Sequence, residues 1–338
     1  MRQYLGIGIG AGLVSALLFG VLLKATALAI VLYLLAPLPI LIVGLGWSHK
    51  AALVAAATGS LVLGLLIAPF LGLGFLAYLA LPAWWLAYLA LLGRPNADGT
   101  MEWYPTGRLL AWTASTAALA FVAIAVIASP NYETFQTRLR EMTRTMLTTQ
   151  AQVSTRQPGS RVEAPTAENP GSQQPEAVPS PPDAKDAKNE VADALAAVAP
   201  GLAAQGLALL LTFYLWAAAR IVQISGRLPR PWPDIPSTVM PRRVLFILTA
   251  AVLLALTPGY IGVLGVAMSG ALSAAFALQG LAAFHDRSRG RKGRTALLFG
   301  LYLILFLTQG VAFVALTLFG IADTVLNLRR SSEGAGRT

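Results

Sequence analysis

Few side chains in this sequence can do acid–base, nucleophilic or metal chemistry. The chain has no cysteine and only two histidines, His49 and His285, which excludes thiolate nucleophiles and histidine-rich metal sites. Nine of the 15 acidic residues lie between Glu133 and Asp193, and only Asp323 lies within a long apolar stretch. Proton and ion relays through membranes need buried carboxylates or histidines, and the sequence has no Walker, HExxH or GxSxG motif. We therefore expect no enzymatic activity, no metal and no cofactor.

Prolines interrupt two apolar segments near their middles and mark the candidate ligand pocket. The first segment contains Pro37 and Pro39, and the second contains Trp84 and Trp85 shortly after a proline. A proline inside a helix removes an N–H and kinks the helix, and transporters place substrates where membrane helices are broken. We predict a pocket lined by these four residues, with Gln279 as a further candidate. The alternative is a pair of kinks that serve helix packing alone.

Several polar residues lie near the ends of the later apolar segments. Asp323 and Asn327 are four residues apart and share one helix face, and Asp323 is expected to pair with Arg329 or Arg330 and fix the helix end. Gln279 either lines a cytoplasmic opening or joins two helices by hydrogen bonds, as amides in membrane helices often do. His285 either lines the same opening or simply marks the membrane boundary.

Small residues recur along the first apolar segment at helical spacing. Gly6 and Gly10 form a GxxxG pair, and Gly12, Ala16 and Gly20 continue the pattern. Small side chains let the backbones of membrane helices approach closely. This stripe either packs against another helix of the same chain or docks the first helix on a second membrane protein. A similar stripe follows in the third apolar segment: Ala51, Ala55 and Gly59, with Ala56, Ser60 and Gly64.

These residues must be positioned by membrane helices. The chain has 338 residues, of which 56% are apolar and 12% charged, whereas a soluble domain carries about 45–50% and 25%. Apolar runs of about twenty residues recur, each long enough to span a membrane. We predict an all-α polytopic membrane protein with nine or ten transmembrane helices, because the last two segments form either one long helix or two short ones. The expected segments are 4–23, 26–46, 51–68, 70–92, 108–128, 201–222, 243–258, 260–284, 295–308 and 311–327.

One long hydrophilic segment divides the chain into two membrane blocks. Within it, Phe135, Leu139, Met142 and Met146 recur at helical spacing, which predicts an amphipathic helix over 131–150. Seven prolines follow among polar residues, a composition that predicts disorder over 153–190. The helix either binds lipid or a partner protein, or it rests on the bundle. The expected divisions are an N-terminal block 1–128, the segment 129–199, a C-terminal block 200–328 and a tail 329–338.

The net charge of +10 is best explained by membrane topology. Arg220 to Arg243 and Arg287 to Arg294 each contain five basic residues, and two apolar segments separate them. Short loops rich in Lys and Arg stay in the cytoplasm, where they face anionic lipids. We therefore expect the N-terminus and both loops in the cytoplasm and residues 130–198 outside. The lipid bilayer is the expected partner, and nucleic-acid binding is not expected.

Several short motifs together resemble those of the YybS-like family, a domain-of-unknown-function family of bacterial integral membrane proteins. They are Leu35 to Pro39 with Gly46-Trp47, Leu81 to Trp85, Gly226 to Pro233, Leu278 to Ala282 with His285, and Gly320 to Arg329. The resemblance implies a bacterial inner-membrane protein without an agreed activity. That family is distantly similar to the S components of energy-coupling-factor transporters and to the rod-shape protein MreD. In S components, small residues on the first helix dock a partner, and Gly6 to Gly20 match that feature.

Two functions are compatible with these features. The first is a small-solute binding or transport subunit without its own ATPase, which predicts a cavity between Pro37–Pro39 and Trp84–Trp85. The second is a non-catalytic scaffold of the cell envelope that acts through the helix 131–150. Both functions imply a membrane protein partner, bound through the first helix or through the outer amphipathic helix.

Overall fold

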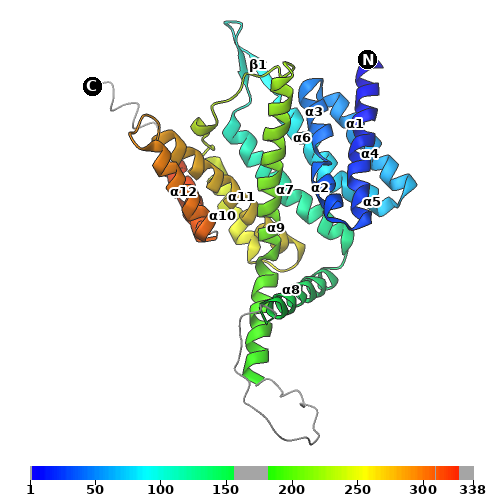
Figure 1. Cartoon of the computed structure of the whole chain (residues 1–338), viewed down its shortest axis with the longest axis vertical. Coiled ribbons are helices and arrows are strands. Elements are labelled where there is room, and N and C mark those ends of the chain that lie inside the picture. The colour runs from blue at the N-terminus through cyan, green and yellow to red at the C-terminus, as the bar shows by residue number, and fades with distance from the viewer. Residues whose placement is uncertain (1, 156–181, 309, 327–338) are drawn as a thin grey trace, which may run out of the picture. The chain divides into compact units, whose positions relative to one another are not determined.

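The computed structural model describes residues 2–155, 182–308 and 310–326, and in these residues the protein is almost entirely helical (Figure 1). Seven helical segments of the described part are long and apolar enough to cross a membrane. Three further apolar helices are shorter: Arg243–Ala255, Arg294–Thr308 and Gly310–Leu326. The predicted all-α membrane architecture is therefore confirmed. The first helices are α1 (Arg2–Gly20), η1 (Val21–Lys24), α2 (Ala27–Leu35), α3 (Leu38–Gly46), α4 (His49–Leu66), α5 (Pro69–Phe75), η2 (Leu76–Ala80) and α6 (Leu81–Ala90).

The remaining elements begin with a small hairpin, in which Arg94 of β1 pairs with Glu102 of β2 in antiparallel register. They are β1 (Gly93–Pro95), β2 (Met101–Trp103), α7 (Thr106–Ala128), α8 (Tyr132–Thr155), α9 (Pro182–Ile224), η3 (Ile235–Ser237), α10 (Arg243–Ala255), α11 (Gly259–Arg287), α12 (Arg294–Thr308) and α13 (Gly310–Leu326). The last two apolar segments are thus separate helices.

Residues 1–128 and 200–338 form one compact unit, and residues 129–199 form a second. Within the first unit α11 packs against α7, α10 and α13, so the two predicted membrane blocks share one core. Pro200 lies inside α9 at the boundary between the units. A proline cannot donate the helical hydrogen bond, so this boundary coincides with a local weakness of the helix.

Local sequence signals explain where several helices begin and break. The side chains of Thr26 and Ser48 accept hydrogen bonds from the N–H groups of Ala29 and Ala51, each at 3.2 Å, and so cap α2 and α4. The expected break at Pro37 separates α2 from α3. The second proline-containing segment is divided by η2, a single π-helical turn, and such turns interrupt the regular hydrogen-bond ladder.

The small-residue stripe of α1 packs against α4, but only along one of its two edges. A Cβ atom on Gly12 would lie 2.5 Å from the carbonyl oxygen of Ala55, and Ala16 is buried. Gly20 has only ordinary contacts with the end of α4. In contrast, a Cβ atom on Gly6 or Gly10 would meet nothing within 4 Å in the described structure. The predicted packing within the chain is thus seen for Gly12 and Ala16, whereas Gly6 and Gly10 lie on another side of the helix, where docking on a second membrane protein stays a prediction.

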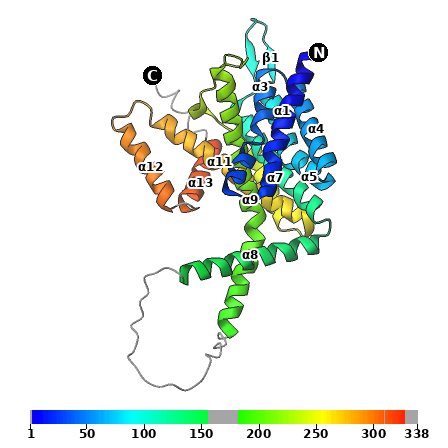
Figure 2. The same cartoon turned by 45° about the vertical axis from the view of Figure 1, so that its right-hand side comes forward.

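The second unit consists of α8 and the first part of α9, which cross one another in both views (Figures 1 and 2). Arg140 of α8 pairs with Asp193 of α9, with 3.3 Å between Nε and Oδ1. Thr143 is buried, whereas Met142 and Met146 on the predicted apolar face are exposed. Most of the segment predicted as disordered, residues 156–181, lies outside the described residues, and its two flanks are helical.

Candidate functional site

The segment between α9 and α10, residues 225–242, closes one end of the first unit; we call it the arginine segment. It begins where Gly226 adopts a positive φ of 69°, a left-handed conformation that ends helices at glycine. The guanidinium carbon of Arg227 lies 4.5 Å from the centre of the Trp47 ring, a cation–π contact. Arg230 donates a hydrogen bond of 3.2 Å from Nη1 to the carbonyl oxygen of Ala90. The segment is thereby attached to the ends of α3 and α6.

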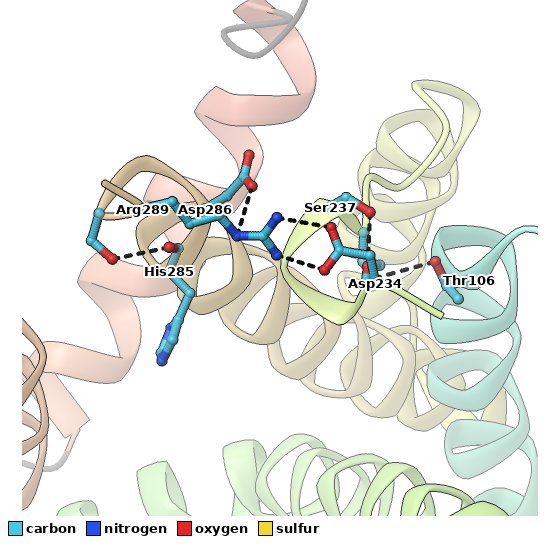
Figure 3. A network of polar contacts seen from close by, with 8 residues as sticks. Thr106, Asp234, Ser237, His285, Asp286 and Arg289 are labelled. Atoms are coloured by element: carbon cyan, nitrogen blue, oxygen red, sulfur yellow. Dashed lines mark hydrogen bonds and ion pairs between the residues drawn. The ribbon is translucent and has the colours of Figure 1, made fainter. Parts of the chain in front are cut away.

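A polar network attaches the other half of the arginine segment to α7 and α11 (Figure 3). Arg289 forms a two-pronged contact with Asp234, with 3.0 Å between Nη1 and Oδ2, and it also lies 3.6 Å from Asp286. Hydrogen bonding to Arg289 lowers the pKa of the Asp234 carboxyl and raises the pKa of the Arg289 guanidinium. On the opposite side, Thr238 donates a hydrogen bond of 3.2 Å to Thr106.

Glycine lets α7 approach the arginine segment without an intervening side chain. A Cβ atom on Gly107 would lie only 1.8 Å from the carbonyl oxygen of Val239, a distance that no larger residue could accept. The next residue, Met240, is buried. Backbone of the arginine segment is therefore packed directly on the first turn of α7.

Gln279 is fully buried and joins the arginine segment to α11 and α13. Its Oε1 accepts a hydrogen bond of 3.0 Å from the N–H of Met240, and its Nε2 donates to Asp323 Oδ2 at 3.1 Å and to Thr324 Oγ1 at 2.8 Å. Asp323 is also buried. The structure thus supports the helix-joining interpretation of Gln279. The other two polar residues predicted at this helix end, Asn327 and Arg329, lie outside the described residues.

A cavity of about 610 Å³ lies beneath the arginine segment. Its walls come from α7, α9 and α11, with the end of α6 and Tyr302 of α12 completing the lining. Deep in the cavity the walls are apolar, and the hydroxyl groups of Thr113 and Thr212 donate to carbonyl groups of their own helices. The other lining residues with polar side-chain atoms are Thr106, Arg230, Thr238, His285, Tyr302 and the two tryptophans Trp216 and Trp232.

Thr106, Arg230, Thr238 and His285 lie at one end of the cavity, the end covered by the arginine segment. Thr106 is the first residue of α7, and Thr113 lies seven residues further along that helix, about 10 Å deeper at 1.5 Å per residue. His285 likewise lies near the end of α11, and its Nδ1 is 2.9 Å from the carbonyl oxygen of Leu281. Because a carbonyl can only accept, Nδ1 carries the proton, and Nε2 lies 3.3 Å from the Tyr302 hydroxyl.

Arg230 is the single permanently charged side chain among the described residues that line the cavity. Its side chain is partly buried, and burial lowers the pKa of its guanidinium, although a guanidinium stays protonated in proteins. Among the described residues no carboxylate pairs with it. The polar end of the cavity therefore carries a net positive charge.

Aromatic side chains with a large exposed fraction form the rim of the cavity. Phe213, Trp216 and Tyr302 are 55%, 45% and 48% exposed. They belong to α9 and α12, two apolar helices that lie among the membrane-spanning part of the chain. The rim therefore opens toward the lipid-facing side of the helices and not only toward the arginine segment.

The sequence profile of one protein family, described as "Predicted membrane protein (DUF2232)", matches residues 13–324. The chain belongs to this family. It has no significant match among curated proteins or among solved structures. The family match supports the membrane assignment and leaves the activity open.

The residues predicted to form a ligand pocket do not line the cavity of this family member. Pro37 is buried, and α3 and α6 pack closely, since a Cβ atom on Gly44 would lie 2.6 Å from Cβ of Ala87. Trp84 and Trp85 stack with their neighbours in an aromatic cluster. At Gly44, α3 and α6 are therefore in direct contact, and Trp84 and Trp85 pack against the core.

The two remaining predicted pocket residues, Pro39 and Gln279, do not line the cavity either. Pro39 is half-buried, and Gln279 is used for hydrogen bonds between helices. By contrast, His285, predicted near a cytoplasmic opening, does line the cavity. The signal for the cavity in the sequence was the stretch Gly226 to Pro233, in which arginines alternate with prolines and end at a tryptophan.

Proposed function

We propose that the protein is a membrane-embedded binding protein for a small amphipathic molecule, acting as a binding or transport subunit without its own ATPase. The observation that carries the proposal is the cavity of about 610 Å³ with apolar walls and polar groups gathered at one end. Ligand pockets typically measure about 300–1,000 Å³ and combine apolar walls with a few polar groups that orient the ligand. The similarity to transporter S components is an additional support from sequence motifs alone.

The polar end of the cavity is proposed to face the cytoplasm. The start of α1, the β1–β2 hairpin, the arginine segment and the turn between α11 and α12 lie at the same end of the first unit (Figure 1). Lys24, in contrast, lies in the last turn of η1, which follows the C-terminal end of α1. Because Lys and Arg are retained on the cytoplasmic side, this arrangement favours the topology expected from the loops.

A cavity-filling substitution tests ligand binding directly. Leu209 of α9 lines the cavity, whereas Leu202 of the same helix is exposed and does not. We expect wild-type protein purified in mild detergent to carry a small molecule that native mass spectrometry detects, and Leu209→Trp to lose it. Leu202→Trp, which adds the same volume on the outer face, should retain it. If folded Leu209→Trp carried the same molecule at the same occupancy, the proposal would be wrong.

The alternative is a non-catalytic membrane scaffold that acts through the second unit. The supporting observation is the exposure of Met142 and Met146 on α8, since exposed methionines suit adaptable protein contacts. Affinity purification of the full chain in mild detergent, compared with Met142→Ser/Met146→Ser, separates the two functions. A partner protein that the double variant loses, together with an empty cavity, would favour the scaffold.

A further inference from the structure

We infer that the cavity takes a membrane lipid with an anionic headgroup, held with its headgroup at Arg230 and its acyl chain between α7, α9 and α11. This inference rests on the proposed function and names the ligand class for the same cavity. Three properties of the site carry it: the sign of its charge, the direction of its polarity and the position of its rim.

The charge of the site selects an anion. Arg230 brings a permanent positive charge to the cavity, and its one described hydrogen bond is to the backbone oxygen of Ala90. The described lining residues include no Asp or Glu. A guanidinium has five N–H donors in a planar fork that fits the oxygens of a phosphate, so most of its donors are available to a ligand. The hydroxyl groups of Thr106 and Thr238 lie at the same end of the cavity and add neutral hydrogen-bonding groups.

The direction of polarity selects an amphiphile and sets its orientation. Along α11 the lining changes from His285 near the helix end back to Leu278, and along α7 Thr106 in the first turn is followed by Leu109 and Leu110. Both helices therefore present a polar residue at the end covered by the arginine segment and apolar residues next to it, and α9 adds the apolar side chains of Leu209, Phe213 and Leu215. A soluble anion would leave the apolar part of the cavity unfilled, whereas a lipid satisfies both parts. Basic pockets between membrane helices on the cytoplasmic side commonly bind anionic headgroups.

The rim allows such a lipid to enter from the bilayer. Phe213, Trp216 and Tyr302 are each about half exposed on apolar helices, so an acyl chain can pass between α9 and α12 without crossing water. The aromatic rings provide an amphipathic edge at the border of the cavity. Entry from the cytoplasmic leaflet then places the headgroup directly under the arginine segment.

Two variants of the arginine segment test the headgroup contact. Arg230→Gln removes the charge of the cavity, and Arg227→Gln removes the same charge from an exposed residue that contacts Trp47 outside the cavity. We expect Arg230→Gln to weaken binding of fluorescent phosphatidylglycerol to delipidated full-length protein by roughly tenfold or more, the factor for one charge-assisted hydrogen bond. Arg227→Gln should bind within about twofold of wild type, as expected for a surface charge.

Competing ligands separate the possible sources of the anion. Unlabelled phosphatidylglycerol should displace the fluorescent lipid, whereas phosphatidylcholine should do so weakly, and inorganic phosphate or glycerol phosphate should not. Displacement by the free phosphates would identify a soluble anion and overturn the inference of a lipid. Equal displacement by phosphatidylcholine, with Arg230→Gln unaffected, would overturn the anionic headgroup.

The variant Leu209→Trp distinguishes failure of this inference from failure of the proposed function. If Leu209→Trp abolishes binding of a molecule for which Arg230 is irrelevant, the cavity is a binding site for a different ligand class and only the present inference is wrong. If folded Leu209→Trp and Arg230→Gln both bind phosphatidylglycerol as wild type does, both proposals are wrong. Size-exclusion chromatography and thermal unfolding establish that each variant is folded.

Discussion

At the scale of single residues, buried polar groups connect parts of the chain that are far apart in sequence. Gln279 contacts the backbone of Met240 and the side chains of Asp323 and Thr324. Gln279 is fully buried, so no bulk water can replace such partners, and each unpaired polar group there is costly. The Gln279 amide therefore joins α11 to α13 and also links both helices to the arginine segment.

Replacing this amide should destabilise the protein. Gln279→Leu preserves most of the volume but leaves the Met240 N–H and the Asp323 carboxyl without this partner. We expect a loss of about 1–3 kcal/mol from removing these hydrogen bonds, measured as a lower midpoint of thermal unfolding in detergent. Gln205→Leu provides the control, because Gln205 is only half-buried and has no hydrogen bond in the described structure. Equal midpoints for the two variants would contradict the coupling role.

The contact between Asp234 and Arg289 predicts a defined pH dependence. Asp234 has a pKa lowered from 3.8, so the folded state favours its ionised form. The stabilisation is complete above the ordinary pKa of 3.8 and is lost as the pH falls through the lower folded value. The difference in unfolding midpoint between wild type and Asp234→Asn should be small, constant from about pH 5 to 8, and should shrink only below that range. A difference that changes near neutral pH would contradict this assignment.

At the scale of elements, the small residues of α1 fall into two groups: some pack against α4, and others have no close contact in the described structure. The edge of α1 that contains Gly12 lies against the backbone of α4, whereas the edge that contains Gly10 has no neighbour in the described structure. Close approach of backbones is what small residues provide in membrane helices. Packing within the chain therefore accounts for only part of the stripe.

Matched substitutions on α1 measure this difference. In Gly12→Leu the new side chain would begin 2.5 Å from the Ala55 carbonyl oxygen, and because that neighbour is backbone it cannot rotate away. Overpacking of this kind costs about 1–3 kcal/mol, and the midpoint of thermal unfolding should fall. Gly10→Leu should leave the midpoint unchanged or raise it, since leucine favours helix more than glycine does. A larger loss in Gly10→Leu would show that the packing faces are assigned the wrong way round.

At the scale of the whole molecule, topology follows from the distribution of basic residues over the two ends of the first unit. The arginine segment and the turn from Arg287 to Arg294 lie at one end (Figure 2), and Arg289 links them directly. Each basic residue near the inner leaflet gains about 1 kcal/mol from anionic lipids. We therefore expect this end to face the cytoplasm and α8 to lie on the outer side.

Single cysteines test the topology, because the natural chain has none. Thr145 of α8 and Lys292 of the α11–α12 turn are both exposed. In intact cells an impermeant thiol reagent should label Thr145→Cys and not Lys292→Cys, and both should be labelled after permeabilisation. Ser288, in the same turn, is less suitable for cysteine labelling, because it is buried and its hydroxyl donates a hydrogen bond to the backbone carbonyl oxygen of His285. The reverse labelling pattern would invert the topology.

The sequence by itself determined the class of the protein and the positions of its helices. Apolar runs of about twenty residues must become helices in a bilayer, because each backbone group has to find its partner within the segment. That requirement is local, and the expected segments therefore match the observed helices within a few residues at most ends. Thr26 and Ser48 set helix starts through contacts only three residues away, and Pro37 sets a helix break for an equally local reason.

Only the tertiary structure decided which residues surround a cavity. Pro37 and Trp84 looked suitable by type, but the space beside their helices is filled by close packing of α3 on α6. Arg230 became a cavity residue because the arginine segment folds back over the ends of α6, α7 and α11. Those contacts join residues separated by 55 to 140 positions. A helical period describes the neighbours within one helix, whereas a cavity depends on the shapes of several helices where they meet.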